Sequence, residues 1–390
     1  MNRSSVRVLM LLNHFHVGGT ETYTLSLTRE LLRQGTKVVI AGQEGQMAPR
    51  FRHLGCPVYI LSDVRMAPLW NPWQKTWQYN PRESRQLRNI ILRENIDLIH
   101  AHEVSIALSV KEIVHEKRIP LVFTVHGQYY NASDIKRIAR TASAVISVSP
   151  PIQDWLKNNG MESRLIPNGI DTREFHFDAE SSETRLHHQI PPDAVVVLYA
   201  ARLTWKKGQI AKQFVEACGR LKKESFPHLH AVIVGDGSQT SEIKKEIRKI
   251  QYPQSPFIHL LGSREDMPRL YSMSDGVVGT GRVALEAMAC RRPVIAAGCE
   301  GLLGLVTPES HEEAWNGYFG DHRAEEPCTV QGLLREMEKL LLITRMKERE
   351  RLTEQGYIFI CDRFHNPGVA DRIRKLYLQL VNAHVQKHTP

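Results

Sequence analysis

Short apolar runs alternate with helical patterns along this 390-residue chain, and that alternation constrains its fold most strongly. In the first half the runs lie at Val6–Leu12, Lys37–Ala41, Pro57–Leu61, Asp97–Ala101, Pro120–Val125 and Ala144–Val148. In the second half they lie at Val195–Ala200, His230–Val234, Phe257–Leu261, Asp275–Val278 and Pro293–Ala296. Such runs, separated by helices, are typical of parallel strands covered on both faces. The chain is therefore predicted to be an α/β protein.

The similar pattern of the two halves predicts two domains. Helices are expected between the runs, for example at Glu21–Gln34, Pro81–Glu94, Gln209–Lys222 and Gly281–Cys290. The polar stretch Asp178–Asp193 is interpreted as a linker. We expect Rossmann-like, doubly wound domains at 1–180 and 181–365 facing across a cleft, and a C-terminal segment at 366–390 containing an amphipathic helix. Ligands of such sheets bind beyond the carboxyl ends of the strands, so informative residues should follow the strands.

Composition narrows the class of protein. The chain is 42% hydrophobic and 24% charged, which is ordinary for a globular protein, and no apolar run approaches the ~18 residues of a membrane span. Met1–Arg7 lacks a signal-peptide pattern, and the six cysteines form no C-x-x-C pair. Reduced thiols and a cytoplasmic location are expected. The net charge of +9 favours polyanionic partners, but it is spread out, which disfavours nucleic acid.

Candidate ligand residues follow the strands of the first half. Gly18 and Gly19 open a helix after the first strand, where free N–H groups favour an anion or hydroxyl, although an ordinary strand–helix turn also carries glycine. His100, His102 and His126 end two strands, so they should point toward one crevice. A satisfied structural histidine is the alternative for each. Their spacing does not match a zinc site.

The second half carries a stronger set of strand-end residues. Arg202 and Lys207 follow its first strand and suit a diphosphate, although a solvated basic loop is the alternative. Gly235 follows the next strand in a tight turn. Gly279 and Gly281 lead into a helix bearing Glu286, which could accept hydrogen bonds from a ribose diol or simply complement the helix dipole. No Walker loop, nucleophile elbow, kinase motif or D-x-D pair competes with this interpretation.

In this order the motifs resemble family 4 retaining glycosyltransferases, which have the GT-B fold and use nucleotide sugars. The resemblance covers nearly the whole chain. It is carried by GGTETYTLSLTRELLRQG, DLIHAHE, FTVHGQY, AVISVSP, RLIPNGID, ARLTWKKG, AVIVGDG, LLGSREDMPRLY and ALEAMACRRPVIA.

The resemblance implies roles for individual residues. Arg202 and Lys207 would hold the donor diphosphate and stabilise the leaving group, Glu286 would bind the ribose hydroxyls, and Gly19 would belong to a loop that closes on the phosphate. His126 would lie near the transferred sugar. Further donor contacts would come from two segments, comprising Gly262, Ser263, Arg264 and Met267 around the base, and Thr280, Gly281, Arg282, Val283 and Ala284 at sugar and phosphate. The final helix would cross back onto the first domain.

One position departs from the family pattern. The family carries a second glutamate eight residues before the one matched by Glu286, and this position is Val278. Two explanations are open, since the donor sugar could be held differently, with Arg282 as a replacement contact, or catalysis could be weakened. The expected reaction moves a sugar from a nucleoside diphosphate, UDP favoured over GDP, to an acceptor hydroxyl, with retention and without a metal or other cofactor.

The acceptor is expected on the first domain, as a glycan, a lipid-linked or a small molecule of cell-envelope polysaccharide or glycolipid synthesis. Trp70, Trp73 and Trp77 lie beside basic residues, which suits sugar stacking or peripheral contact with the inner membrane face, although packing on the core is the alternative. Two other functions stay open: a nucleotide-sugar-binding protein with little or no transfer activity, and a GT-B-fold epimerase.

Overall fold

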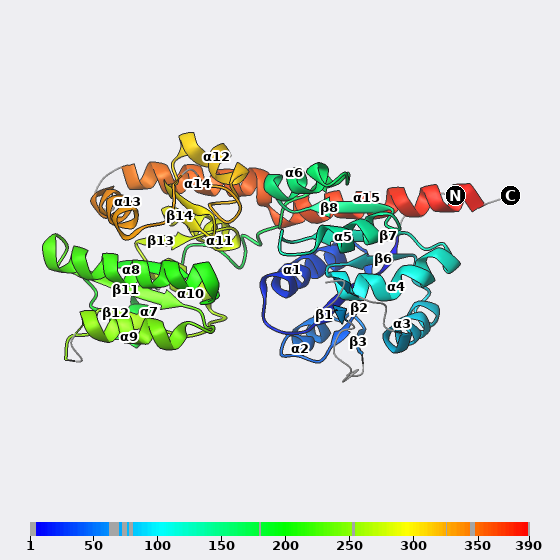
Figure 1. Cartoon of the computed structure of the whole chain (residues 1–390), viewed down its shortest axis with the longest axis horizontal. Helices are drawn as coiled ribbons and strands as arrows, with labels where there is room; N and C mark the ends of the chain where they lie inside the picture. Colours follow the sequence, from blue (N-terminus) through cyan, green and yellow to red (C-terminus); the bar gives the residue numbers. More distant parts are fainter. Residues whose placement is uncertain are drawn as a thin grey trace. The chain divides into compact units, whose positions relative to one another are not determined.

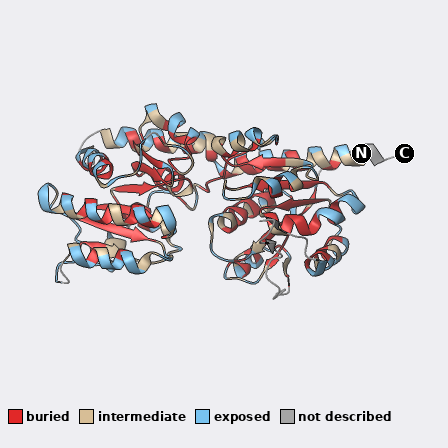
Figure 2. Ribbon diagram, in the orientation of Figure 1, coloured by how far each residue is buried: buried red, intermediate tan, exposed pale blue. Residues whose placement is uncertain are grey.

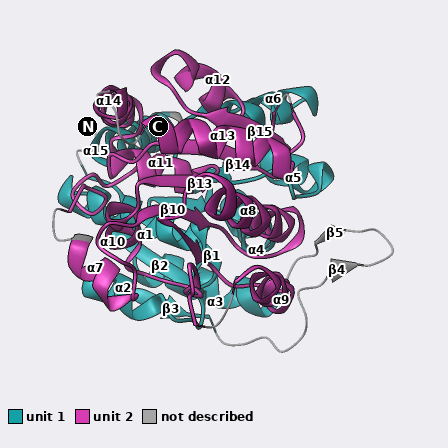
Figure 3. Cartoon of the chain, turned by 90° about the vertical axis from the view of Figure 1, so that its left-hand side faces the viewer, with its two compact units in different colours: residues 1–169, 366–390 teal, residues 170–365 magenta. Residues whose placement is uncertain are grey.

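The computed structural model describes residues 5–61, 70–71, 76–77, 81–178, 181–251, 254–324, 326–343 and 348–388. The chain divides into two compact units, Met1–Gly169 with Asn366–Pro390 and Ile170–His365 (Figure 3). The polypeptide thus changes unit at Gly169 and Ile170, earlier than the expected position at 180/181, and returns at Asn366. Each unit is an α/β domain with a sheet that is parallel apart from one antiparallel edge strand in the second unit, as the alternating pattern predicted in the main.

The first unit contains a seven-stranded parallel sheet of order β3-β2-β1-β6-β7-β8-β9 (Figure 1). Its strands are β1 (Arg7–His14), β2 (Lys37–Gln43), β3 (Val58–Ile60), β6 (Leu98–Ala101), β7 (Leu121–Val125), β8 (Ala144–Ser147) and β9 (Arg164–Leu165). One face is covered by α1 (Gly19–Arg33), α2 (Ala48–His53) and α15 (Asn366–His388). The other is covered by α3 (Pro81–Arg93), α4 (Val104–Lys117), α5 (Ala132–Ala139) and α6 (Pro150–Asn158). The central strands, from β2 to β8 in the sheet order, are buried on both faces (Figure 2), which explains their apolar sequences.

The C-terminal helix α15 is part of the first unit because its apolar stripe completes the core there. Val369, Ile373 and Tyr377 recur every four residues and are buried against the α1 side of the sheet. The Tyr377 hydroxyl lies 2.5 Å from Nδ1 of His100 in β6, whose Nε2 lies 2.7 Å from Oγ1 of Thr124 in β7. A polar chain therefore ties α15 to two central strands.

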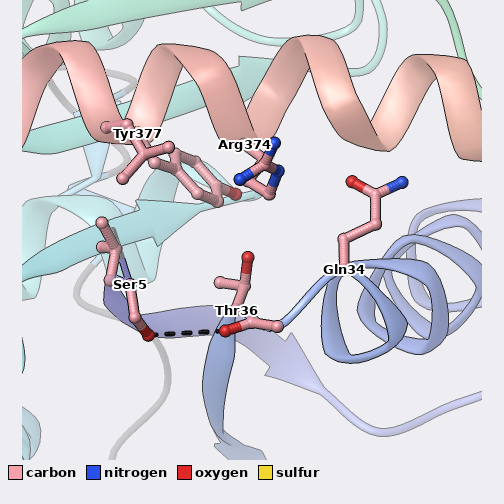
Figure 4. Close-up of a pocket in the computed structure, with 8 residues that line it drawn as sticks. Ser5, Gln34, Thr36, Arg374 and Tyr377 are labelled. Atoms are coloured by element: carbon pink, nitrogen blue, oxygen red, sulfur yellow. Dashed lines mark hydrogen bonds between the residues drawn. The ribbon is translucent and has the colours of Figure 1, made fainter. Parts of the chain in front are cut away.

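A small pocket lies beside α15, lined by Ser5, Gln34, Thr36, Arg374 and Tyr377 among others (Figure 4). Ser5 and Thr36 directly precede β1 and β2, so this pocket is at the amino ends of the strands. Ligands of doubly wound sheets bind at the opposite edge.

The second unit contains a sheet of order β12-β11-β10-β13-β14-β15. Its strands are β10 (Val195–Ala200), β11 (Leu229–Val234), β12 (Ile258–Leu260), β13 (Gly276–Gly279), β14 (Val294–Gly298) and the antiparallel edge strand β15 (Gly301–Leu305). Helices α8 (Trp205–Glu224), α9 (Thr240–Ile250) and α13 (Val330–Ile343) share one core cluster. Helices α10 (Met267–Met273) and α11 (Arg282–Ala289) pack against β10 and β13 outside this cluster, and α12 (His311–Asn316) and α14 (Glu348–Phe364) follow.

The stretch that was interpreted as a linker is instead part of the second unit. It contains α7 (Ser181–His187), which packs against α10. Arg185 donates to the carbonyl oxygens of Met273 and Ala194 and forms a 3.0 Å ion pair with Asp275. At least one polar side chain of this stretch, Arg185, is therefore there to form hydrogen bonds and an ion pair within the second unit. In the described part of the chain, no helix is long and apolar enough to cross a membrane.

We predict that Tyr377→Phe destabilises the first unit by about 1–3 kcal/mol, because it leaves a buried His100 nitrogen without its partner. Urea unfolding would measure the change. Tyr129→Phe is the matched control, since Tyr129 is 70% exposed and its change should fall within about 0.5 kcal/mol. Equal unfolding midpoints for wild type and Tyr377→Phe would contradict the prediction.

Candidate functional site

The strand order of the second sheet reverses between β10 and β13. At such a switch point the loops after the two strands leave toward opposite faces, and doubly wound sheets bind ligands in the crevice expected there at the carboxyl edge. The loop after β10 carries Arg202, and Lys207 lies in the first turn of the following helix α8. Arg202 is exposed, and within the described residues its guanidinium has no hydrogen-bond or ion-pair partner. Trp205, between them, is 83% exposed and has a left-handed backbone with φ of 44°. An unpaired guanidinium at a topological switch point suits an anionic ligand.

Lys207 differs from Arg202 because it already has an anionic partner. Its Nζ lies 3.0 Å from Oδ1 and 3.2 Å from Oδ2 of Asp321, and its backbone carbonyl accepts a 2.7 Å hydrogen bond from the Tyr199 hydroxyl. Burial alone would raise the pKa of the Asp321 carboxyl, but the charges of Lys207 and His322 hold that pKa below its ordinary value. No local sequence motif marks Asp321, and it was not among the predicted site residues.

Only Thr280 and Gly281 connect β13 to α11. Thr280 donates a 2.7 Å hydrogen bond to the carbonyl of Phe319, and Gly281 has φ of 52°. A Cβ at Gly281 would lie 3.0 Å from the Tyr318 ring, so both the backbone and the available space favour glycine there. The turn presents the first N–H groups of α11 at the crevice, where they could bind a phosphate or sugar oxygen.

Glu286 lies one turn into α11 and is buried. Its Oε2 accepts a 3.0 Å hydrogen bond from the Tyr271 hydroxyl, and its Oε1 accepts a 2.6 Å hydrogen bond from Nε of Arg282. Burial raises the pKa of the Glu286 carboxyl, although Arg282 and Tyr271 both oppose the shift. Each oxygen keeps a second lone pair, so a bound diol could still donate to this carboxylate. Arg282 thus pairs with Glu286 through Nε, and its part as a replacement sugar contact stays a prediction.

Val278 does not line the crevice. It lies within β13, is fully buried in the core cluster, and pairs in register with Tyr199 of β10 and Ile295 of β14. A glutamate in this strand position would bury a charge among apolar side chains. The structure therefore places the Val278 side chain in the core. Val278 ends the strand predicted at Asp275–Val278, but its spacing from Glu286 did not show which way its side chain points.

Two glycine turns complete the carboxyl edge beyond β11 and β12. Gly235 has φ of 134°, and a Cβ there would lie 1.8 Å from the Ala201 carbonyl, so only glycine fits. Its N–H donates a 2.8 Å hydrogen bond to Gly262, which also has a positive φ. Ser263 follows, and Arg264 makes two hydrogen bonds of 2.8 and 2.7 Å to Asp266 at the start of α10.

The predicted donor residues of the second unit thus follow β10, β11, β12 and β13 at one sheet edge. Of the remaining residues named for this unit, Met267 begins α10, and Val283 and Ala284 lie in the first turn of α11 with Ala284 fully buried. A buried methyl group leaves Ala284 only its backbone for contact. The roles of these residues stay predictions.

The first unit holds the histidines and glycines that were predicted to follow its strands. Gly18 precedes α1 and Gly19 begins it, and a Cβ at Gly19 would meet open space. Nδ1 of His102 lies 3.2 Å from Nε2 of His126, and the Tyr23 ring packs edge-on against both. Burial lowers the pKa of His126 to about 3, so this ring is a neutral hydrogen-bonding group. His100 instead pairs with Tyr377 and Thr124, the structural alternative considered for it.

Glu103, directly after His102, was not singled out in the sequence. Its carboxylate accepts a 2.5 Å hydrogen bond from the Asn13 N–H, and burial, with the charge of Glu21 adding to it, raises the pKa of Glu103 to about 7. Its position directly after a strand was the signal that could have identified it.

The tryptophan segment is only partly described. The backbones of Trp70–Asn71 (β4) and Thr76–Trp77 (β5) pair as antiparallel strands. The side chains of Trp70 and Trp77, and the whole of Trp73, lie outside the described residues, so the predicted acceptor or membrane contact stays a prediction.

Comparison with known proteins agrees with this arrangement. Residues 17–174 match the model of Glycosyltransferase Family 4, and residues 180–359 match that of Glycosyl transferases group 1. An uncharacterized glycosyltransferase of Methanocaldococcus jannaschii is 24% identical over 75% of this chain and 80% of its own. A phosphatidylinositol N-acetylglucosaminyltransferase subunit of Arabidopsis thaliana is 25% identical over 77% of this chain and 67% of its own.

The fold also matches that of solved structures. The crystal structure of Anabaena HepE in complex with UDP-glucose has a TM-score of 0.74 at 20% identity, over 95% of this chain and 99% of that one. The two family models together cover most of the chain, one on each unit, and the architecture is that of their fold. The chain therefore belongs to the glycosyltransferases of the GT-B superfamily.

Proposed function

We propose that this glycosyltransferase transfers a hexose from a UDP-sugar to a hydroxyl of a glycan or lipid-linked acceptor, with retention of anomeric configuration and without a metal. The observation that carries the donor assignment is the exposed, unpaired Arg202 beside Lys207 at the switch point of the second sheet. Arginine and lysine together would offset the charge of a diphosphate. The presence of UDP-glucose in the HepE complex supports the choice of base.

The residues of the second unit have distinct parts in this proposal. Arg202, Lys207 and the first N–H groups of α11 stabilise the charge that develops on the departing diphosphate. Glu286 accepts hydrogen bonds from the ribose diol while Tyr271 and Arg282 hold its carboxylate in place. The acceptor hydroxyl attacks the anomeric carbon as the bond to the phosphate oxygen breaks, and a phosphate oxygen takes the hydroxyl proton.

The acceptor is proposed as lipid-linked or polymeric because the Arabidopsis relative is named for a phosphatidylinositol substrate. His126, in the first unit, is proposed to donate or accept one hydrogen bond near the transferred sugar as a neutral ring. Peripheral membrane contact through the tryptophan segment belongs to the same proposal.

A donor panel tests the function directly. UDP- and GDP-sugars would be added with EDTA present, and thermal shift, nucleotide release and product configuration would be followed with and without glycan or lipid extracts. Acceptor-dependent UDP release supports the proposal. Binding without release would favour a nucleotide-sugar-binding protein, and an isomerised sugar without release would favour an epimerase.

Removing Arg202 should weaken donor binding most. We expect Arg202→Ala to raise the Kd for UDP by about 10- to 100-fold, since charged hydrogen bonds contribute about 1.5–3 kcal/mol each. Arg202→Lys should restore part of the affinity, because it keeps the charge and loses the planar fork. Calorimetry would measure the affinities. Lys206→Ala is the matched control, since Lys206 lies in the first turn of α8, four residues after Arg202, in an exposed ion pair with Glu300. Equal losses in both variants would contradict the site.

Glu286 should make donor binding depend on pH. Its carboxyl has a raised pKa, so on acidification it gains a proton before an ordinary glutamate does and loses acceptor capacity for the diol. The affinity for UDP should therefore fall from about pH 8 to about pH 5 more steeply in wild type than in Glu286→Gln, which has no proton to gain. Titration of the nucleotide is common to both proteins and cancels in the comparison. Parallel profiles would exclude this role for Glu286.

A further inference from the structure

We propose that Asp321 is a positioning residue that holds the Lys207 ammonium where charge develops on the departing diphosphate. This inference rests on the proposed donor site. The two residues are 114 positions apart in sequence, and Lys207 Nζ contacts both carboxylate oxygens, at 3.0 and 3.2 Å. The ammonium donates one hydrogen bond to Oδ2, and because it has three N–H donors it keeps at least one for a phosphate oxygen.

The backbone that carries Asp321 is itself fixed. Tyr318, Phe319 and Gly320 are three consecutive residues with φ of 49°, 55° and 82°. A left-handed conformation in successive residues is costly for side chains other than glycine and persists only where the surroundings enforce it. Strained segments of this kind cluster at functional sites, which makes the residue that follows this turn a candidate for a role.

One buried side chain and three hydrogen bonds enforce the turn. The Phe319 side chain is fully buried, and its N–H donates a 2.6 Å hydrogen bond to the Ala314 carbonyl. Thr280 of the β13–α11 connection donates to the Phe319 carbonyl, and the Gly320 carbonyl accepts a 3.0 Å hydrogen bond from the Glu300 N–H. The turn therefore links Asp321 to the same connection that presents the N-terminus of α11.

The Lys206–Glu300 ion pair, on the adjacent residue of α8, is a comparison for the Lys207–Asp321 pair because it is more exposed. Lys206 and Glu300 lie 2.8 Å apart, but their side chains are 62% and 49% exposed, whereas those of Lys207 and Asp321 are 28% and 18% exposed. An exposed pair is weakly held and screened by salt. The partly buried pair restrains its lysine before any ligand binds.

Asp321 therefore has two opposed effects on the donor. Its negative charge lies beside the proposed diphosphate site and weakens attraction for a bound anion, while its hold on Lys207 provides the preorganised cation that the transition state needs. Loss of the carboxylate should consequently separate binding from turnover. A residue with a purely structural role would not produce this separation.

The test compares Asp321→Asn with Glu300→Gln in the full chain, using UDP for calorimetry and UDP-glucose, or the sugar nucleotide that the donor panel identifies, for turnover. We expect Asp321→Asn to lower kcat by about 10- to 100-fold while the Kd for UDP stays equal or decreases. Asp321→Glu should recover part of kcat, and Glu300→Gln should leave both quantities at wild-type values. Unchanged kcat in Asp321→Asn would overturn the inference.

A parallel loss of UDP affinity and kcat in Asp321→Asn, or a loss of folding that Asp321→Glu does not rescue, would also overturn it, because either outcome indicates a structural role. Arg202→Ala separates this failure from that of the proposed function. If Arg202→Ala leaves UDP binding unchanged, the donor site itself is wrong. If it weakens binding and Asp321→Asn changes nothing, only the positioning role fails.

Discussion

The reversal of strand order between β10 and β13 is the constraint on which the proposed donor site depends. Right-handed connections carry the chain to opposite faces of the sheet on the two sides of this point, so helices cover both faces but not the carboxyl edge between them. Arg202 and Glu286 lie on loops and helices that leave this edge in different directions. Their placement at the same sheet edge is a consequence of topology and requires no contact between their own segments of sequence.

Of the three charged groups proposed to bind the donor at the carboxyl edge of the second sheet, two already have partners in the protein and one does not. Glu286 is buried but held by Tyr271 and Arg282, and Lys207 is held by Asp321. Arg202 has no partner among the described residues. A site built in this way presents its acceptor oxygens and one cation in fixed positions, and leaves one guanidinium to be neutralised by a ligand. That division suits a reaction in which negative charge grows on a leaving group.

Much of the fold could be predicted because buried parallel strands have a local signature. The strand at Val195–Ala200 was predicted with the bounds that the structure has, and α15 was recognised from its apolar spacing. The edge strand β15 was not predicted, because it is rich in glycine and only one of its neighbours constrains it. Helix α7 was taken for a linker because two of the groups that pair with Arg185, the Met273 carbonyl and the Asp275 carboxylate, belong to a distant segment.

The sequence by itself determined that two parallel-sheet domains form and that Arg202, Lys207 and Glu286 follow strands, because periodicity and strand-end position are local properties. Only the tertiary structure decided how these groups are paired. Tyr271 reaches Glu286, and Asp321 reaches Lys207, through folding that brings together segments remote in sequence. It also decided that the Val278 side chain packs in the core, because the helices that bury this face of β13 come from other parts of the chain. The physical reason is that hydrogen-bond partners and buried contacts depend on distances in the folded chain, and residues far apart in sequence can be close there.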